Sequence, residues 1–129
     1  MTVAIDACVL IAHFDESDAH HAAATSLLAS LIGQRFLVHP LTAADVLVGS
    51  ARLGRVRERQ DSIRSMRVEI AAVDDEAPVR LAELRAGTRH RTPDCCVLDV
   101  ALRNVASVAT FDEPLRATAR KLRLRTLPR

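Results

Sequence analysis

Four aspartates occupy positions where an α/β protein carries catalytic groups. Asp6 directly follows a short apolar segment, and Asp112 follows another one near the end of the chain. Asp45 and Asp94 each fall in the first turn of a predicted helix. Parallel α/β sheets bind their ligands outside the carboxyl ends of the strands. The sequence therefore predicts that these carboxylates gather at one edge of a sheet.

Strands and helices are expected to alternate along the chain. Short apolar segments predict strands, and apolar residues at helical spacing predict helices between them. This alternation indicates an α/β fold with a mainly parallel central sheet of about four to five strands and helices on both faces. The expected strands cover 2–5, 36–39, 68–73, 107–110 and 125–127, and the expected helices cover 7–12, 17–32, 42–53, 57–66, 74–86, 92–104 and 113–121.

Carboxylates brought together in this way repel one another. Two like charges ~4 Å apart cost about 4 kcal/mol at an effective dielectric constant near 20. A cluster of that cost usually contains a cation or a proton. Oxygen ligands without an accompanying Cys or His spacing favour Mg²⁺ or Mn²⁺ over zinc.

Each acid also has a structural role open to it. Asp45 stands three residues after Thr42, close to the spacing of a capping box. Asp94 could favour a helix dipole, and Asp112 could cap the last helix. Asp6 gains little structurally from its place at the end of an apolar strand. The metal hypothesis therefore depends on the four acids together.

Composition predicts one globular domain over residues 1–129. The chain is 49% hydrophobic and 26% charged, which is typical of a folded domain with a core of its own. No apolar run approaches the ~20 residues of a membrane span, and the start of the chain lacks the basic region of a secretory signal. Three cysteines, two of them adjacent, form no disulfide framework. We therefore expect a cytoplasmic protein with no membrane partner.

The basic residues suggest a polyanion as partner. Of 18 basic residues, 17 are arginine, which suits bidentate phosphate contacts, although a codon bias explains this equally well. Only three residues are aromatic, so a stacking platform for single-stranded nucleic acid is not expected. Arg89, His90 and Arg91 precede Asp94 and could reach a phosphate. A basic run near the second acid is either a solvated helix face or a contact for RNA or for an acidic protein segment: Arg52, Arg55, Arg57, Arg59, Arg64 and Arg67.

Five segments carry a resemblance to a known family. Residues 3–12, Val-Ala-Ile-Asp-Ala-Cys-Val-Leu-Ile-Ala, resemble the opening of a PIN domain, and residues 18–24 resemble the first helix of VapC-type toxins. Residues 41–47 and 92–98 are similar to the second and third acidic segments of that family. Residues 109–112 are similar to its fourth segment. The resemblance covers nearly the whole chain, with the segments in the family's order.

This resemblance implies a PIN-like three-layer sandwich and a metal-dependent RNA endonuclease, the toxin of a VapBC-type toxin–antitoxin pair. Asp6, Asp94 and Asp112 would hold Mg²⁺ or Mn²⁺, and Asp45 would orient a metal-bound water or bind a second ion. The reaction would be hydrolysis of an RNA phosphodiester by metal-activated water. Thr110 would support the site.

The sequence departs from the family pattern at several positions. The second acid is most often Glu, and here Asp45 is one methylene shorter. Cys8 stands where Ser or Thr is common, and a thiol is a weaker hydrogen-bond donor. Cys95 and Cys96 are expected to be small buried residues, with a redox or soft-metal role as the alternative. Asp99 is either a possible fifth acid beside the site or a structural residue.

The resemblance also implies protein partners. VapC-type proteins usually form homodimers and bind a VapB-type antitoxin in a hydrophobic groove near the early helices. Candidate contacts for such a groove are apolar residues that core burial explains as well: Phe14, Leu27, Leu28 and Leu31.

Three other functions remain open from the sequence. The chain could be a PIN-domain nuclease of RNA processing or turnover that has no antitoxin, or a catalytically weakened PIN-like binding module. A phosphoryl-accepting receiver domain also gathers acids around Mg²⁺, but it needs a lysine after a strand. The only lysine, Lys121, falls in the last predicted helix.

Overall fold

A computed structural model describes all residues, 1–129, and contains one parallel β-sheet. Its five strands lie in the order β3-β2-β1-β4-β5, and every neighbouring pair is parallel. The predicted parallel sheet is therefore confirmed. The strands are β1 (Thr2–Ile5), β2 (Arg35–Val38), β3 (Val68–Ile70), β4 (Ser107–Ala109) and β5 (Thr126–Leu127).

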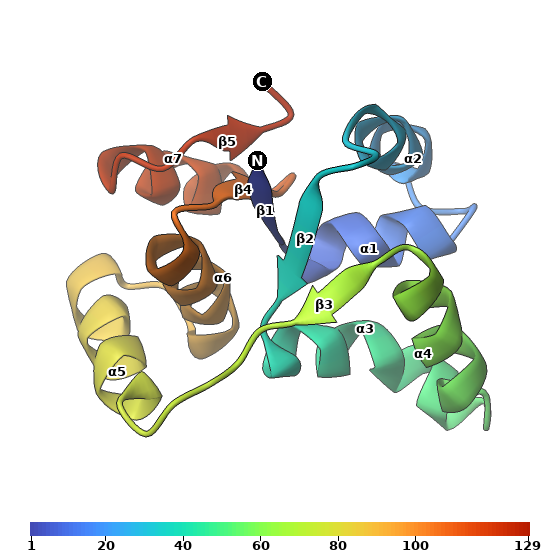
Figure 1. Ribbon diagram of the computed structural model, residues 1–129, viewed down its shortest axis with the longest axis horizontal. Helices are drawn as coiled ribbons and strands as arrows, with labels where there is room; N and C mark the ends of the chain where they lie inside the picture. Colours follow the sequence, from blue (N-terminus) through green and yellow to red (C-terminus); the bar gives the residue numbers. More distant parts are fainter.

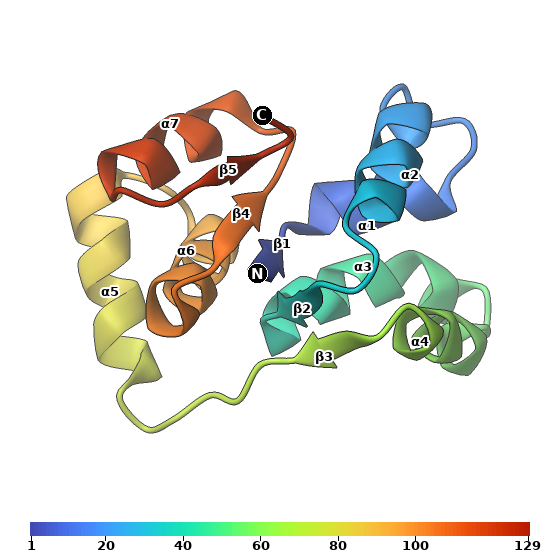
Figure 2. The same cartoon turned by 45° about the horizontal axis from the view of Figure 1, so that its top comes forward.

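Seven helices cover the two faces of this sheet, so the molecule has three layers (Figures 1 and 2). One face carries α1 (Ala7–Phe14), α2 (His21–Ser30), α3 (Pro40–Arg52) and α4 (Val56–Ser65). The other face carries α5 (Ala77–Thr88), α6 (Thr92–Asn104) and α7 (Glu113–Lys121).

Strand alternation divides the core into two clusters. Val3 and Ile5 of β1 pack with the helices α1 to α4, while Ala4 between them packs with α6 and α7. Successive residues of a strand point to opposite faces, so a wholly apolar strand can serve both layers. This explains why the central strand β1 reads as a nearly continuous apolar run rather than as an alternating one.

The strand order creates a switch point beside the central strand. After β1 the chain adds β2 and β3 on one side, and it then crosses to add β4 and β5 on the other side. The carboxyl ends of β1 and β4 are therefore adjacent at the point where the winding reverses, which is where open α/β sheets bind ligands. Asp6 directly follows β1, and Asp112 follows β4 after two residues.

Two helices begin at other residues than predicted, because side chains bind the backbone near their first turns. The helix expected from residue 17 begins at His21, because Asp15 and Asp18 form turns instead, each accepting the backbone N–H two residues later. The helix expected from Thr42 begins at Pro40, because the Nδ1 atom of His39 accepts the backbone N–H of Leu41.

A buried arginine ties the end of β4 to the end of the chain. Arg116 is 7% exposed and donates to the carbonyl of Thr110 at 3.2 Å and to that of Pro128 at 2.6 Å. This clamp holds the segment that leads from β4 into the candidate site.

None of the seven helices combines the length and the apolar character that a membrane-spanning helix needs.

Candidate active site

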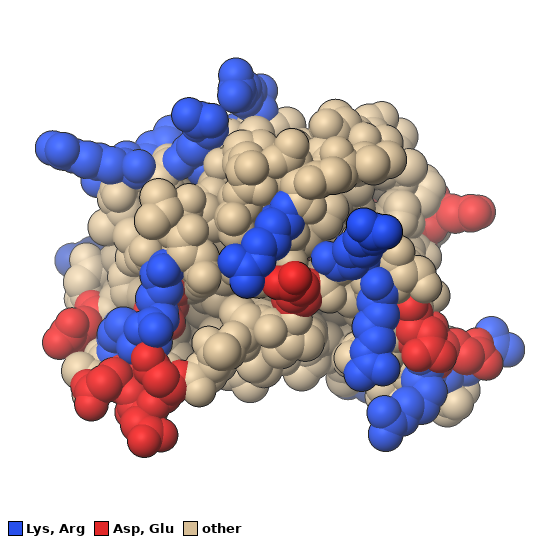
Figure 3. All heavy atoms as spheres, in the orientation of Figure 1, with Lys and Arg blue, Asp and Glu red and all other residues tan.

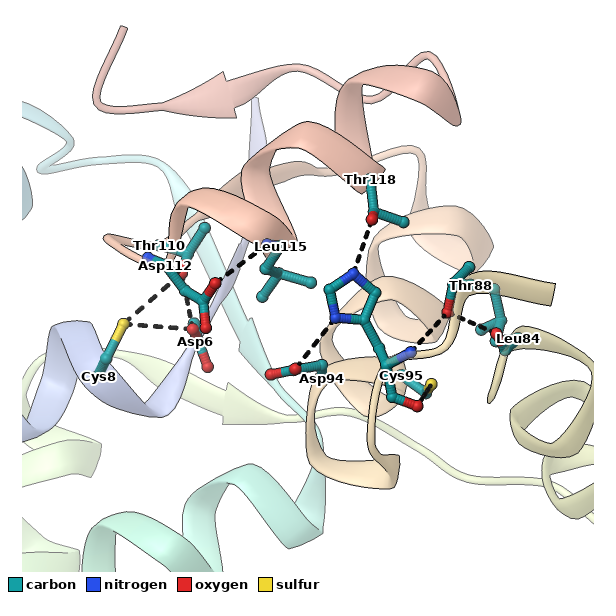
Figure 4. Close-up of polar contacts among 11 residues, drawn as sticks. Asp6, Cys8, Leu84, Thr88, Asp94, Cys95, Thr110, Asp112, Leu115 and Thr118 are labelled. Carbon is teal, nitrogen blue, oxygen red and sulfur yellow. Dashed lines mark hydrogen bonds and ion pairs between the residues drawn. The ribbon is translucent and has the colours of Figure 1, made fainter. Parts of the chain in front are cut away.

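Asp6 lies at the centre of the polar cluster at the switch point (Figure 4). Its Oδ2 atom accepts hydrogen bonds from Thr110 Oγ1 at 2.7 Å and from the thiol of Cys8 at 3.2 Å. Asp6 occupies the N-cap position of α1, yet its side chain makes no capping bond. The carboxylate is thus held by one oxygen, and Oδ1 is left available to a ligand.

Thr110 links this acid to Asp112. Its hydroxyl is fully buried and donates to Asp6, while the same oxygen accepts the backbone N–H of Asp112 at 3.0 Å. Asp112 Oδ1 in turn accepts the backbone N–H of Leu115 at 3.1 Å and so caps α7. Asp112 therefore has the capping role considered from the sequence, and only one of its oxygens is engaged in it.

Asp94 reaches the same region from the first turn of α6. Burial raises the pKa of its carboxyl group, and the negative charges of Asp6 and Asp112 raise it further. A hydrogen bond between Oδ2 and His90 Nδ1, 3.2 Å long, acts in the opposite direction. The three acids therefore share one electrostatic neighbourhood, as expected for a site that receives a cation.

The donor set suits a hydrated hard cation better than an enclosed metal cage. No three His, Cys, Asp or Glu side chains lie close enough together to hold an ion by themselves. Mg²⁺ usually keeps several of its waters and is bound through one or two carboxylates. Asp6 and Asp94 each have one oxygen outside the hydrogen bonds described above, and carboxylate oxygens are the ligands that Mg²⁺ and Mn²⁺ prefer.

Asp45 lies in the second turn of α3 rather than in the predicted first turn, because the helix begins at Pro40, and it is not among the acids whose charge shifts the pKa of Asp94. It is exposed on α3, a helix that packs against α1 and α6, and no hydrogen bond joins it to Asp6, Asp94 or Asp112. Its charge acts instead on Cys96 of α6, whose pKa is raised to about 11, mainly by burial.

Asp99 is occupied by an ion pair on the other side of α6. The carboxylate is 5% exposed, and its two oxygens accept from Arg80 of α5 at 2.8 and 3.1 Å. Arg80 also binds Asp74 in the loop before α5. The structure thus gives Asp99 the structural role that was the alternative to a fifth acid, joining α5 to α6.

The three cysteines are free thiols. Burial and the charge of Asp6 raise the pKa of Cys8 to about 11, so this thiol stays protonated and can donate to Asp6. Cys95 and Cys96 are fully buried in α6, in keeping with the expectation that they are small core residues.

His90 and Thr118 complete the site, although neither was predicted to support Asp94. The ring of His90 bridges Asp94 and the hydroxyl of Thr118, with 2.6 Å between Nε2 and Oγ1. Both ring nitrogens therefore bind protein atoms, which argues against the expected contact between His90 and a phosphate. No local sequence pattern joins residues 28 positions apart on different elements.

Basic residues are concentrated at the end of the chain, a surface that was not predicted to be functional. Residues 114–129 contain six basic residues and no acid, so the other 113 residues carry a net charge of −4 within the total of +2. Figure 3 shows Lys and Arg side chains gathered at the upper left of the molecule, over α7 and β5. Five of the six are exposed, and we call four of them, Arg120, Lys121, Arg123 and Arg125, the C-terminal basic patch.

The PIN domain family matches residues 3–121 of this sequence. The chain belongs to the PIN domain family. It is a family of nucleases, and the match spans all the acids discussed above. The sequence-based prediction of a PIN-like three-layer fold is therefore confirmed. Among curated proteins, none matches this chain in sequence.

Two solved structures share the fold. A toxin–antitoxin complex from Klebsiella pneumoniae has a TM-score of 0.71 at 19% identity, over 87% of this chain and 87% of its own. VapBC2 from Rickettsia felis, bound to a DNA fragment from its promoter, has a TM-score of 0.69 at 14% identity, over 98% of this chain and 97% of its own. At these identities the comparison establishes the fold of this PIN domain.

The raised pKa of Asp94 predicts a cost in stability when the site holds no metal. An acid whose pKa is higher in the folded state stabilises the fold while it is protonated, and this contribution is lost as the pH rises through the folded-state value. The substitution Asp94→Asn should therefore raise the melting temperature of the metal-free protein at pH 7 by a few degrees. The gain should fade as the pH falls toward 3.8, the ordinary carboxyl value.

Thermal unfolding followed by circular dichroism in the presence of a chelator would measure this effect. Asp75→Asn, at an exposed position in the loop before α5, is the matched control and should leave the melting temperature unchanged. A lower melting temperature for Asp94→Asn at pH 7 would contradict the electrostatic description of the site.

Proposed function

We propose that this PIN domain is a Mg²⁺- or Mn²⁺-dependent RNA endonuclease that acts as the toxin of a toxin–antitoxin pair. The observation that carries the proposal is the meeting of Asp6, Asp94 and Asp112 at the switch point of the sheet. Membership of a nuclease family supports the reaction type. The proposed place of action is the cytoplasm, where RNA is present.

In this proposal, Asp6 and Asp94 bind the cation directly, and Asp112 holds it or its waters from the opposite side. A bound Mg²⁺ or Mn²⁺ would supply a Lewis acid that activates water and offsets charge on the phosphodiester. Asp45, exposed on the neighbouring helix, orients water or binds a second ion.

The remaining groups of the site hold these acids in place. The hydroxyl of Thr110 and the thiol of Cys8 donate to the same oxygen of Asp6, and these two bonds restrain the orientation of the carboxylate. The backbone N–H of Leu115 does the same for Asp112. The chain thus contributes a preorganised negative pocket, so little reorganisation is needed when the cation binds.

Removal of a single carboxylate should abolish the nuclease activity. Asp6→Asn keeps the size of the side chain and its bond to Thr110 but removes the charge, so cleavage of a labelled RNA in Mn²⁺ should fall at least about a hundredfold. Growth inhibition on induced expression should disappear with it. Asp75→Asn is the control, and circular dichroism would verify that both variants fold.

Cleavage that persists in the Asp6→Asn protein would contradict the proposed mechanism. Mapping of RNA ends after induction, with the same variant beside the wild type, would identify the RNA that is cut.

The C-terminal basic patch is the surface that best fits an RNA backbone. It lies at the far end of α7, the helix whose first turn contains Asp112 at the site. The arginines of α4 are interspersed with Glu58 and Asp61, and Arg59 packs over the ring of Phe14. Unpaired cations attract phosphates by releasing counterions, and this makes binding dependent on salt.

The double substitution Lys121→Ala/Arg125→Ala should weaken RNA binding several-fold and lower the salt dependence of log K by about one to two units. Fluorescence anisotropy with a single-stranded RNA in the presence of a chelator avoids cleavage during the measurement. Arg57→Ala/Arg64→Ala is the matched control, because it also removes two exposed cations. An equal loss of affinity in both proteins would contradict a specific role for the patch.

The antitoxin half of the proposal is supported by the structural neighbours, two of which are toxin–antitoxin complexes. The expected contacts Leu27, Leu28 and Leu31 are buried in the core of this chain. Beside them runs a groove of about 660 Å³ between α2 and the end of α4, lined by residues that include Ile32 and Met66. Ile32 is 80% exposed, so the groove offers an antitoxin an apolar contact near the early helices.

Co-expression with a short neighbouring gene, where one is present, should relieve the growth inhibition. Ile32→Asp should cancel this relief, because it places a charge in the apolar groove, and it should leave RNA cleavage unchanged. Relief by the neighbour's product that survives Ile32→Asp would exclude the groove as its binding site. RNA cleavage without any inhibiting partner would favour the alternative of a nuclease in RNA processing or turnover. The homodimer stays a prediction, which light scattering can test.

A further inference from the structure

A chain of hydrogen bonds runs from α7 to the candidate metal site through His90, whose ring lies between the labelled residues Thr118 and Asp94 in Figure 4. The hydroxyl of Thr118 lies 2.6 Å from Nε2 of the ring, and Nδ1 lies 3.2 Å from Oδ2 of Asp94. The side chain of His90 is only 11% exposed. These hydrogen bonds therefore join three elements in a largely buried setting: α7, the loop between α5 and α6, and α6.

The types of donor and acceptor determine which atom donates in each of these hydrogen bonds. An ionised carboxylate only accepts hydrogen bonds, so the hydrogen between His90 and Asp94 must be on Nδ1. In a neutral imidazole the other nitrogen is then an acceptor, so the Thr118 hydroxyl donates to Nε2. A hydroxyl can donate or accept, so the Thr118 hydroxyl fits the tautomer that Asp94 requires and stabilises it by donating to Nε2.

The backbone around His90 is fixed as well. Its N–H donates to the hydroxyl of Thr88 at 3.3 Å, and that hydroxyl donates to the carbonyl of Leu84 at 2.6 Å. The carbonyl of His90 accepts from the thiol of Cys95 at 3.7 Å. With both its backbone and its ring held, the imidazole can act as a rigid support for Asp94.

This support leaves the rest of the carboxylate free. The imidazole occupies Oδ2 of Asp94, and in Figure 4 the other oxygen lies on the side toward Asp6. We propose that His90, held in its Nδ1–H form by Thr118, is a positioning residue that orients Asp94 toward the divalent cation. The inference rests on the metal site of the proposed function and adds to it two residues outside the acidic set.

Three substitutions test the hydrogen bonds of His90 one by one. His90→Leu removes both ring bonds and should weaken Mn²⁺ binding roughly tenfold or more, as the loss of a hydrogen bond to a metal ligand commonly does. His90→Asn places an amide N–H close to the position of Nδ1 and should restore most of that affinity. Thr118→Val, which removes only the hydroxyl, should give an intermediate loss.

Isothermal titration calorimetry with Mn²⁺ alone measures these affinities without reference to catalysis. Thr25→Val is the matched control, because Thr25 also lies within hydrogen-bond distance of a histidine, the exposed His13, at 3.0 Å. It should leave Mn²⁺ binding unchanged. Equal affinities for wild type and His90→Leu would overturn the inference while the metal site stood. Failure of the wild-type protein to bind Mn²⁺ would overturn the metal site, and the role of His90 with it.

The tautomer can be read directly in the metal-free protein. Long-range ¹H–¹⁵N spectra, recorded at a pH about two units above the ordinary imidazole pKa, distinguish the two neutral forms of each histidine. His90 should be in the Nδ1–H form in the wild type and should shift toward the Nε2–H form in Thr118→Val. An Nε2–H form in the wild-type protein would overturn the proposal that Thr118 donates to Nε2 and that Nδ1 donates to Asp94.

Discussion

Mutual repulsion of three carboxylates is the constraint on which this structure depends. Asp6, Asp94 and Asp112 are brought to one edge of the sheet by strand order and by the starts of three helices. Burial raises the pKa of Asp94, and the charges of Asp6 and Asp112 raise it further. Each acid is held by its own hydrogen bonds, so none can turn away to relieve the repulsion. The fold thus maintains an electrostatic cost that a divalent cation would offset.

Much of this arrangement could be predicted from the sequence because it follows from local patterns. Apolar strands alternating with helices predicted the parallel sheet, and an acid directly after a strand predicted a side chain at its carboxyl edge. Asp6 and Asp112 are such residues, and Asp94 follows the Thr-Pro start of a helix. The order of these segments was enough to identify the PIN family.

The rest depends on contacts between distant residues, which leave no local pattern. The sequence left open whether Asp99 is a further acid of the site, because its partner Arg80, which binds both of its oxygens, lies 19 positions away. The bond between His90 and Thr118 spans 28 positions and places a histidine beside Asp94 rather than beside a phosphate. Helix α3 begins at Pro40 instead of Thr42, because His39 caps it by accepting the backbone N–H of Leu41.

The central claim is that the three acids form one cation site. Anomalous diffraction from crystals soaked in Mn²⁺ tests it most directly, because the scattering locates the metal independently of the protein atoms. The account predicts a peak in contact with Asp6 and Asp94 at the carboxyl edge of the sheet, on the side toward Asp112. A map with no peak there, or with manganese only at other surface carboxylates, would contradict it.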